Sequence, residues 1–315
     1  MMYPTFALII PTLNAEHDLP ELFDGILSQS LQPNKILVID SHSTDNTLAL
    51  LDKLPVIIHS INRSDFDHGG TRQLGTMLVN TDLYVFMTQD AIPAHPDTFK
   101  NLIHALLANE KMGCVYGRQL PKKNADPISI HGRLFNYPET SYIRSYEDRK
   151  KYGIKTCFNS DNLAAYRKSA LNEIGGFPHP MITGEDAFVA ATLLKHGYLI
   201  GYVSTALIYH SHNLTLRQEF HRYFSVGVFH RRAHWILKEF STADSEGFRF
   251  VTSELVFLLK QKKILWIMKA FFSTVIKYLA YKIGLHEQYI PFRIKKKWGV
   301  SKNFWIMEQS KAFSL

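Results

Sequence analysis

Short, uninterrupted apolar runs recur along the first part of the chain, and each run ends in polar residues. Such runs are typical of parallel strands, which are buried on both faces. Segments whose apolar positions have helical spacing lie between them. We expect strands at 6–10, 35–39 and 83–87 and helices at 19–29, 44–53 and 71–80. Because the two kinds of segment alternate, the pattern predicts an α/β fold with a mostly parallel sheet flanked by helices.

The middle of the chain has a less regular pattern. Residues 121–155 are rich in Lys, Arg, Tyr and Pro, and we interpret them as a long mobile segment of the kind that often carries function. The residues that follow predict a helix, a Gly-Gly-Phe-Pro turn, a second helix and a strand, at 162–174, 175–178, 185–196 and 199–209.

The last third of the chain is helical and basic. Apolar positions keep a helical period over 214–239 and 253–285, and a Lys-Lys-Lys-Trp run follows at 295–298. We therefore predict one α/β domain over 1–215 and a helical region over 216–315.

The charge balance points to a partner that carries phosphate. The net charge is +8 and the pI is about 9.2, which suits nucleic acid, an anionic membrane or a phosphorylated substrate. No zinc-finger, RNP or basic-zipper motif occurs, so nucleic acid is the least favoured of the three.

Two cysteines, Cys114 and Cys157, lie far apart and form no CxxC pair, which favours a reducing compartment. The first residues have neither the cationic start nor the cleavage site of a signal peptide. No stretch of about 20 residues is free of charge, so no membrane span is expected.

Acidic residues follow the predicted strands, with Asp40 ending the second and Asp90 just beyond the third. In an open α/β sheet the ligand crevice lies outside the carboxyl ends of the strands, so both carboxylates would face one cleft. The alternative is ordinary helix capping, for which Asp is also favoured.

A phosphate ligand in such a cleft would call for a divalent cation with oxygen ligands. His210 and His212 are two residues apart at the end of a predicted strand, so their side chains point the same way and could join Asp90. Histidine suits Mn²⁺ better than Mg²⁺. The alternative is a pair of surface or hydrogen-bonded histidines.

Three further segments carry chemistry or a simpler structural role. Glu185 and Asp186 open a helix, where they could act as a general base or as favourable charges at the helix dipole. The run 66–72 combines two glycines with Arg72 and could approach phosphate, or it could be a turn with a surface arginine. A cationic helical stretch near Arg222 could hold phosphate or simply face solvent.

The order and spacing of these segments resemble the family 2 inverting glycosyltransferases of the GT-A fold. The matching motifs are Ile9–Asn14, Val38–Thr47, Phe86–Ala91, Gly175–Phe177 and Gly184–Asp186. The resemblance implies a nucleotide-sugar half over about 1–120 and an acceptor half over about 121–215. It also implies a divalent cation, Mg²⁺ or Mn²⁺, held by Asp90 with His210 and His212.

The resemblance assigns roles to individual residues. Asp186 would be the catalytic base, with Glu185 as the second candidate. The nucleotide-sugar would be bound by Pro11, Thr12, Asn14, Asp40, His68, Gly69, Arg72, Gln89, Asp90 and Arg222. One residue departs from the family pattern, because Thr88 replaces the first aspartate of the Asp-x-Asp metal motif.

Within the family, the segments 66–72, 88–91 and 209–213 resemble those of bacterial rhamnosyltransferases. That similarity implies a dTDP-L-rhamnose donor and a lipid-linked oligosaccharide acceptor, in O-antigen or capsule synthesis. Two alternatives stay open, a sugar nucleotidyltransferase and a non-catalytic glycan- or membrane-binding protein on the same fold.

The segment 264–285 is apolar nearly all round but contains Lys269, Lys277 and Lys282. Lysines are costly both in a buried core and in the centre of a membrane span. We expect an interfacial helix with snorkelling lysines, attached peripherally to the cytoplasmic face of an anionic bacterial membrane. The competing interpretation is a helix packed on the catalytic domain or at the interface of a homo-oligomer.

Overall fold

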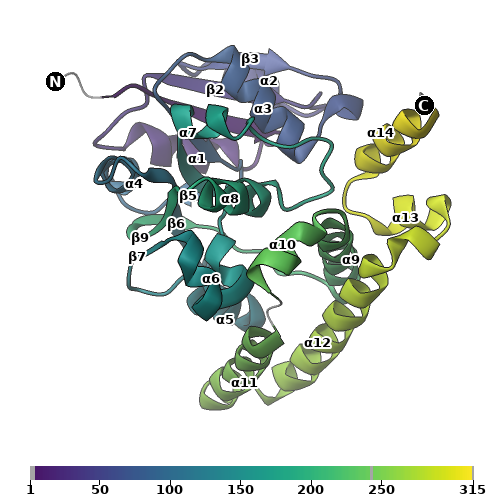
Figure 1. Ribbon diagram of the computed structural model, residues 1–315. Helices are drawn as coiled ribbons and strands as arrows, with labels where there is room; N and C mark the ends of the chain where they lie inside the picture. The colour runs from purple at the N-terminus through teal and green to yellow at the C-terminus, as the bar shows by residue number, and fades with distance from the viewer. Residues whose placement is uncertain (1–3, 242–243, 314–315) are drawn as a thin grey trace.

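The computed structural model describes residues 4–241 and 244–313. Within these residues one central sheet has helices on both faces, and the C-terminal helices extend along one side (Figure 1). The strands are β1 (Phe6–Thr12), β2 (Lys35–Asp40), β3 (Ile57–Ser60), β4 (Leu83–Met87), β5 (Ile92–Pro93), β6 (Met112–Leu120), β7 (Tyr142–Arg144), β8 (Leu163–Arg167) and β9 (Leu199–Tyr209).

The helices before the C-terminal region are α1 (Leu19–Leu27), α2 (Thr47–Leu51), α3 (His68–Leu78), α4 (Thr98–Leu107), α5 (Pro127–Asn136), α6 (Arg149–Tyr152), α7 (Lys168–Glu173) and α8 (Glu185–Lys195). The C-terminal region consists of α9 (Leu216–Arg232), α10 (His234–Phe240), α11 (Asp244–Lys260), α12 (Ile264–Leu285), α13 (Phe292–Trp298) and α14 (Lys302–Phe313).

The sheet is mixed, and one half of it is parallel. Its order is β3-β2-β1-β4-β8-β6-β9-β5, and β7 also pairs with β9. β3, β2, β1 and β4 run parallel, whereas β8 is antiparallel to both of its neighbours. The carboxyl ends of β1, β2 and β4 therefore meet at one edge of the sheet.

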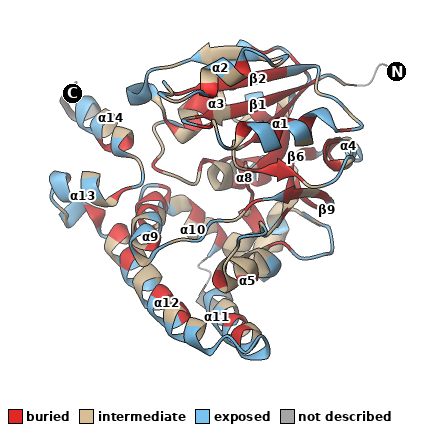
Figure 2. Cartoon of the chain, turned by 180° about the vertical axis from the view of Figure 1, so that it is seen from behind, coloured by how far each residue is buried: buried red, intermediate tan, exposed pale blue. Residues whose placement is uncertain are grey.

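Both faces of the sheet are covered, which explains the uninterrupted apolar runs. In β1, Ala7 and Ile9 belong to the core on one face, and Leu8 and Ile10 belong to the core on the other. Helices α1 and α4 contribute to the second core, and α8 to the first. The central strands β1, β2, β4 and β8 are accordingly buried along most of their length (Figure 2).

The structures predicted for two segments were wrong. Residues 121–155 are not a long mobile segment, because they form α5, β7, α6 and short 3₁₀ turns. Helix α5 begins where Asp126 accepts a hydrogen bond from the Ser129 amide at 2.8 Å, with Pro127 in its first turn. The expected helix 162–174 begins as strand β8, since pairing with β4 and β6 overrides the helix propensity of Leu-Ala-Ala.

Helix α12 is attached to the rest of the protein where it crosses α9. A Cβ atom on Gly284 would lie 2.1 Å from the carbonyl oxygen of Phe224, and one on Gly227 would lie 2.3 Å from that of Tyr281. Real Cβ atoms do not approach backbone oxygens this closely. The two helices therefore touch backbone to backbone, and the crossing requires glycine on both sides.

Replacing Gly284 by alanine should force α9 and α12 apart. Overpacking of this kind costs about 1–3 kcal/mol in the free energy of unfolding, which a urea titration would measure. The matched control is Gly132→Ala in α5, where the added Cβ meets nothing within 4 Å and should be neutral or slightly stabilising. An unchanged unfolding midpoint in Gly284→Ala would contradict the close crossing.

Candidate active site

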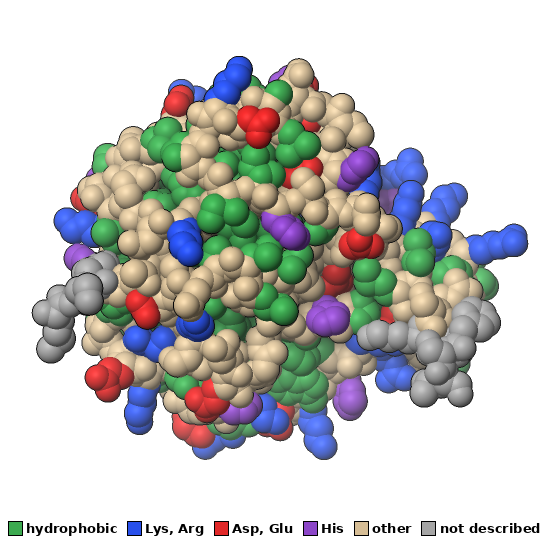
Figure 3. Space-filling model, turned by 90° about the horizontal axis from the view of Figure 1, so that it is seen from above, with side chains coloured by type: hydrophobic (Ala, Val, Ile, Leu, Met, Phe, Trp, Pro, Cys, Tyr) green, Lys and Arg blue, Asp and Glu red, His purple; other side chains and the backbone are tan. Residues whose placement is uncertain are grey.

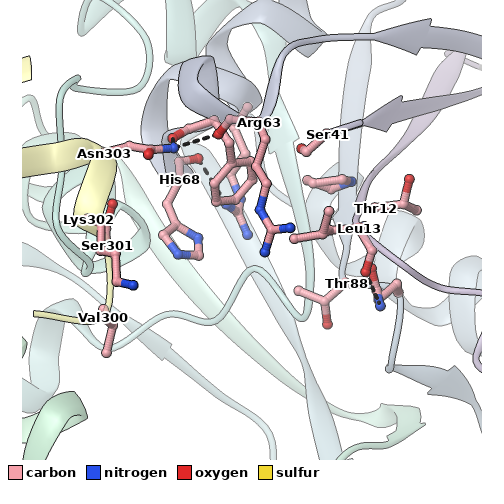
Figure 4. Close-up of a pocket in the computed structure, with 14 residues that line it drawn as sticks. Thr12, Leu13, Ser41, Arg63, His68, Thr88, Val300, Ser301, Lys302 and Asn303 are labelled. Atoms are coloured by element: carbon pink, nitrogen blue, oxygen red, sulfur yellow. Dashed lines mark hydrogen bonds between the residues drawn. The ribbon is translucent and has the colours of Figure 1, made fainter. Parts of the chain in front are cut away.

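A cavity of about 500 Å³ opens at the carboxyl ends of β1, β2 and β4 (Figure 4). Each strand supplies part of its lining. Pro11, Thr12 and Leu13 come from β1 and the loop after it, Ser41 follows β2, and Thr88 and Gln89 follow β4. His68 and Arg72 of α3 complete this side of the cavity. Of the residues predicted to bind nucleotide-sugar, five lie here directly: Pro11, Thr12, His68, Arg72 and Gln89.

The wall opposite Thr12 and Leu13 comes from the other end of the chain. Residues 300–303, which are the end of the link after α13 and the first two residues of α14, line the cavity, and we call them the C-terminal strap (Figure 4). The Asn303 side-chain amide donates to the carbonyl oxygens of Arg63 at 2.6 Å and Phe66 at 3.1 Å. Sequence reasoning missed the strap, because Val-Ser-Lys-Asn carries no motif.

Three predicted residues shape the loops around the cavity. The Asp40 carboxylate is fully buried and accepts hydrogen bonds from the Thr12 hydroxyl at 3.2 Å and the Ser43 amide at 2.9 Å. The Asn14 side chain accepts from the Thr44 amide at 2.9 Å. Gln89 accepts from the Leu13 amide at 2.8 Å. Asp40 and Asn14 therefore hold the loops in place and do not line the cavity.

Beside this cavity, Asp90, His210 and His212 bring their side chains together. The Nε2 atoms of both histidines lie 3.2 Å from Asp90 Oδ2, and the ligand atoms of all three lie within 4.8 Å of one another. β9 positions the two histidines and the turn after β4 positions the aspartate. The structure thus joins the three residues that the sequence predicted as metal ligands.

A second layer of side chains orients this cluster. His210 Nδ1 lies 2.9 Å from Gln119 Oε1, an acceptor, so Nδ1 carries the hydrogen and Nε2 presents its lone pair. Asn162 Nδ2 lies 3.1 Å from Thr88 Oγ1 and 2.9 Å from His210 Nε2. Thr88, the departure from the acidic family motif, is therefore tied to the cluster through Asn162 and by its own hydrogen bond to Asp90. Sequence reasoning missed both Gln119 and Asn162, which lie in no recognisable motif.

The charge states of the cluster suit cation binding. Burial opposes ionisation of Asp90, but the interactions of its carboxyl with His210, Thr88 and His212 outweigh burial and hold the pKa of Asp90 below its usual range. Burial lowers the pKa of His210, and burial together with His210 lowers the pKa of His212 to about 4. At neutral pH the cluster presents one carboxylate and two neutral imidazoles, a donor set that fits a divalent cation.

Arg72 is the centre of a buried group of carboxylates. Its side chain lies 2.8 Å from Asp161 and 3.0 Å from Glu185. Burial opposes ionisation of Glu185, but the charge of Arg72 outweighs it and lowers the pKa of that carboxyl. Burial raises the pKa of Asp161 to about 6 despite Arg72. Asp161 had no sequence signal and was not predicted.

Asp186 has a different environment from its neighbour. No cation lies within ion-pair distance of it among the described residues, and its carboxylate accepts only from the Ala187 amide at 2.7 Å. Burial, with the charges of Glu185 and Asp161, raises the pKa of Asp186 to about 8. A carboxyl with a pKa near the working pH is suited to proton transfer.

Two predicted phosphate contacts are placed differently by the structure. The 66–72 run is not a turn with a surface arginine, because α3 begins at His68, with Asp67 accepting from the Gly70 amide at 2.7 Å, and Arg72 is buried. Gly69 is packed against the chain itself, and a Cβ there would lie 1.9 Å from the Pro178 carbonyl oxygen. Arg222 lines a second cavity and not the one at the strand ends.

Comparison with known proteins agrees with this arrangement. Residues 7–175 match the family described as Glycosyl transferase family 2. The chain is 44% identical to the O-antigen chain rhamnosyltransferase RfbN of Salmonella typhimurium, over 95% of each chain. It is 42% identical to the O-antigen chain rhamnosyltransferase WbaN of Salmonella anatum, over 96% of each.

Solved structures with the same fold are much more distant in sequence. A mannosyltransferase from Pyrobaculum calidifontis, PcManGT, in complex with GDP-Man and Mn²⁺, superposes with a TM-score of 0.62 at 16% identity, over 91% of this chain and 87% of that one. TarS 1–349 of S. aureus in complex with UDP gives a TM-score of 0.52 at 15% identity, over 90% and 91%. These likenesses confirm the predicted GT-A fold. Together with the family match and the two relatives, they establish that this chain is a glycosyltransferase belonging to family 2.

Proposed function

We propose that this enzyme transfers L-rhamnose from dTDP-L-rhamnose to a lipid-linked oligosaccharide during O-antigen synthesis. The observation that carries the proposal is the near full-length match to two relatives that are both named O-antigen chain rhamnosyltransferases. The family match leaves little support for the alternative of a sugar nucleotidyltransferase. The clustered Asp90 and the raised pKa of Asp186 speak against a non-catalytic protein.

The donor would lie in the cavity at the strand ends, with its nucleoside between the β1 loop and the C-terminal strap. Asp90, His210 and His212 would hold a divalent cation beside Thr88, which lines that cavity. Such a cation stabilises the charge that develops on a departing diphosphate. The Mn²⁺ in the mannosyltransferase of the same fold supports this assignment.

Asp186 is the better candidate for the base. The acceptor hydroxyl must lose its proton as it attacks the sugar, and a carboxylate can take that proton. Glu185 is engaged by Arg72, which lowers its basicity, whereas Asp186 has no cationic partner among the described side chains. The displacement would be direct and would invert the configuration at the sugar carbon.

The strap gives a specific expectation for donor binding. Asn303→Ala removes the hydrogen bonds to the carbonyls of Arg63 and Phe66, and the strap should then close the cavity less firmly. We expect the KM for the donor to rise about five- to tenfold, since each hydrogen bond contributes about 1 kcal/mol. Steady-state kinetics would measure it, with the KM for the acceptor as the internal control. A donor KM equal to that of the wild type would refute a role for the strap.

A panel of sugar nucleotides tests the proposed function. Purified protein would be incubated with dTDP-, UDP- and GDP-sugars, Mn²⁺ or Mg²⁺, and a bacterial membrane lipid extract as the source of acceptor. We expect release of nucleoside diphosphate that depends on the extract and is fastest with dTDP-L-rhamnose. Faster release from another sugar nucleotide would keep the reaction class and reject rhamnose.

The expectation of snorkelling lysines on α12 needs correction. Lys269 lies 2.9 Å from Asp126 and Lys277 lies 3.2 Å from Glu219, so both turn toward the protein in ion pairs, and Lys282 alone of the three is exposed. Trp298 is not an interfacial anchor either, because its ring packs against Phe220 and Phe224. The competing prediction, a helix packed on the rest of the chain, holds for the side of α12 that carries Lys269 and Lys277.

The outer side of α12 nevertheless suits a membrane. Leu265 is 87% exposed and Phe271 61%, and Phe248 on the adjacent α11 is 73% exposed. By length and composition, α12 could even cross a bilayer, although no span was expected from the sequence. Basic side chains project together from one side of the molecule (Figure 3), and Arg293 and Lys297 of α13 are exposed. We infer peripheral attachment to an anionic membrane through α11 and α12.

Two substitutions on this outer side test the attachment. Leu265→Gln with Phe271→Gln should lower binding to phosphatidylglycerol vesicles about tenfold or more, since each large apolar side chain contributes about 1.5–3 kcal/mol when buried. Vesicle sedimentation would measure it. The matched control replaces Ile57 and Met77, which are also exposed but lie on β3 and α3. Equal loss in both double variants would argue against a specific membrane face.

A further inference from the structure

A second cavity of about 500 Å³ lies among α5, α9, α11 and α12, away from the donor cavity. Its lining is rich in cations: five basic side chains face it with only two carboxylates, Asp126 and Glu219. The basic residues are Arg133, Lys155, Arg222, Lys269 and Lys277. Nothing in the proposed donor chemistry accounts for this charge.

Part of that charge is neutralised within the protein, and part is not. Lys269 pairs with Asp126 and Lys277 pairs with Glu219. Among the described residues, neither Arg133 nor Arg222 has a carboxylate within 4.0 Å. The Nε atom of Arg133 is buried and has no hydrogen-bond partner there. Arg133 is half-buried and Arg222 is exposed, and neither positive charge is balanced by a carboxylate within the cavity, so the cavity is suited to receive an anion.

The cavity also has a defined position between the reaction centre and the apolar helices. His212, a member of the proposed cation site, lines its inner end. Phe250 and Val251 of α11 line the outer end, next to the exposed apolar side of α11 and α12. An anion bound here would lie beside the cation site at one end and beside a membrane-facing surface at the other.

A buried polar contact joins α5 and α11, two of the helices that line the cavity. His131 of α5 lies 3.0 Å from the Ser253 hydroxyl and 3.8 Å from Glu254, and both of these residues are on α11. His131 and Glu254 are buried, with 3% and 2% of their surfaces exposed. This contact holds α11 against α5, so the cavity is a built site and not a chance gap between loosely packed helices.

We propose that this cavity binds the phosphate group of a lipid-borne acceptor. Arg133, Lys155 and Arg222 would contact the phosphate oxygens, and the apolar chain would leave along α11 and α12 toward the membrane. The glycan attached to the same phosphate would extend past His212 toward Asp186. The proposal rests on the proposed function, because it assigns the acceptor half of the same reaction, and it moves Arg222 from the donor to the acceptor.

The test uses farnesyl diphosphate, which combines a phosphate group with an apolar chain. The full chain would first be saturated with dTDP and Mn²⁺, so that the donor cavity and the cation site are occupied, and titrated by calorimetry. We expect binding that weakens about tenfold or more in the Lys155→Gln, Arg222→Gln double variant, because charge-assisted hydrogen bonds are lost. The charge-matched control is Lys151→Gln with Arg217→Gln, two exposed residues outside this cavity.

Each alternative outcome has a meaning. Equal affinity in the double variant and its control, with both proteins folded, would overturn the proposal. Equal binding of farnesol would also overturn it, because the phosphate would then not be recognised. Equal binding of inorganic pyrophosphate would reject a lipid-borne ligand in favour of a free phosphate. None of these binding measurements needs turnover. A failure of the sugar-nucleotide panel can therefore be told apart from a failure of phosphate binding in this cavity. The affinity of each variant for dTDP reports on the donor cavity.

Discussion

Asp186→Asn is expected to lower kcat about 10²–10⁴-fold while the affinity for the donor nucleotide stays within about twofold of the wild type. Asparagine has nearly the same shape as aspartate but cannot accept the proton of the acceptor hydroxyl. The loss should therefore appear in the chemical step alone, as measured by steady-state kinetics and by calorimetric titration with dTDP.

Glu185→Gln provides the comparison for Asp186→Asn. It removes the charge of one of the two carboxylate partners of Arg72, so it should lower stability and perturb the site without removing the base. If Glu185→Gln abolished turnover in a folded protein while Asp186→Asn kept full activity, the base would have been assigned to the wrong residue.

The wild-type pH profile should report the same group. Burial and the neighbouring carboxylates raise the pKa of Asp186 to about 8. A general base acts in its deprotonated form, so kcat/KM should be low well below that pKa, rise through it, and level off above it. The rising limb should disappear in Asp186→Asn. A profile that falls as the pH rises through this range would contradict the assignment.

Asp90→Asn is expected to have the second largest effect. It removes the carboxylate that faces both His210 and His212, and an amide is a much weaker ligand for a hard cation. Activity should fall about 100-fold or more at a fixed Mn²⁺ concentration, and part of it should return as the concentration of Mn²⁺ is raised.

Mn²⁺ titration of turnover would measure this effect, and Asp97→Asn is a suitable control because Asp97 is an acidic residue at the start of α4, remote from the cluster. A donor-dependent rate that is the same with and without chelator, in wild type and Asp90→Asn alike, would count against a cation at this position.

The parts of the site that the sequence predicted are those that follow from strand order. Pro11 and Thr12 end β1, and Gln89 and Asp90 follow the end of β4. In parallel strands these ends must meet at one edge. His210 and His212 follow the end of β9 with the spacing of an extended chain, and the structure brings them to Asp90.

The remaining features depend on contacts between segments that are distant in the chain. Asp161 meets Arg72 and Glu185 only because β8 inserts between β4 and β6, and β8 itself looks helical in sequence. The strap reaches the donor cavity because α12 and the helices after it fold back along α9. Lys269 and Lys277 of α12 face inward because Asp126 and Glu219 lie opposite them. No local pattern encodes these partners.

The central claim is a direct displacement in which Asp186 activates the acceptor. The most direct measurement is the anomeric configuration of the transferred sugar in the isolated product, determined by NMR and compared with that of the donor. A single displacement inverts the configuration, whereas passage through a covalent sugar–enzyme intermediate retains it. The account predicts inversion, and a product that retains the configuration of the donor would contradict it.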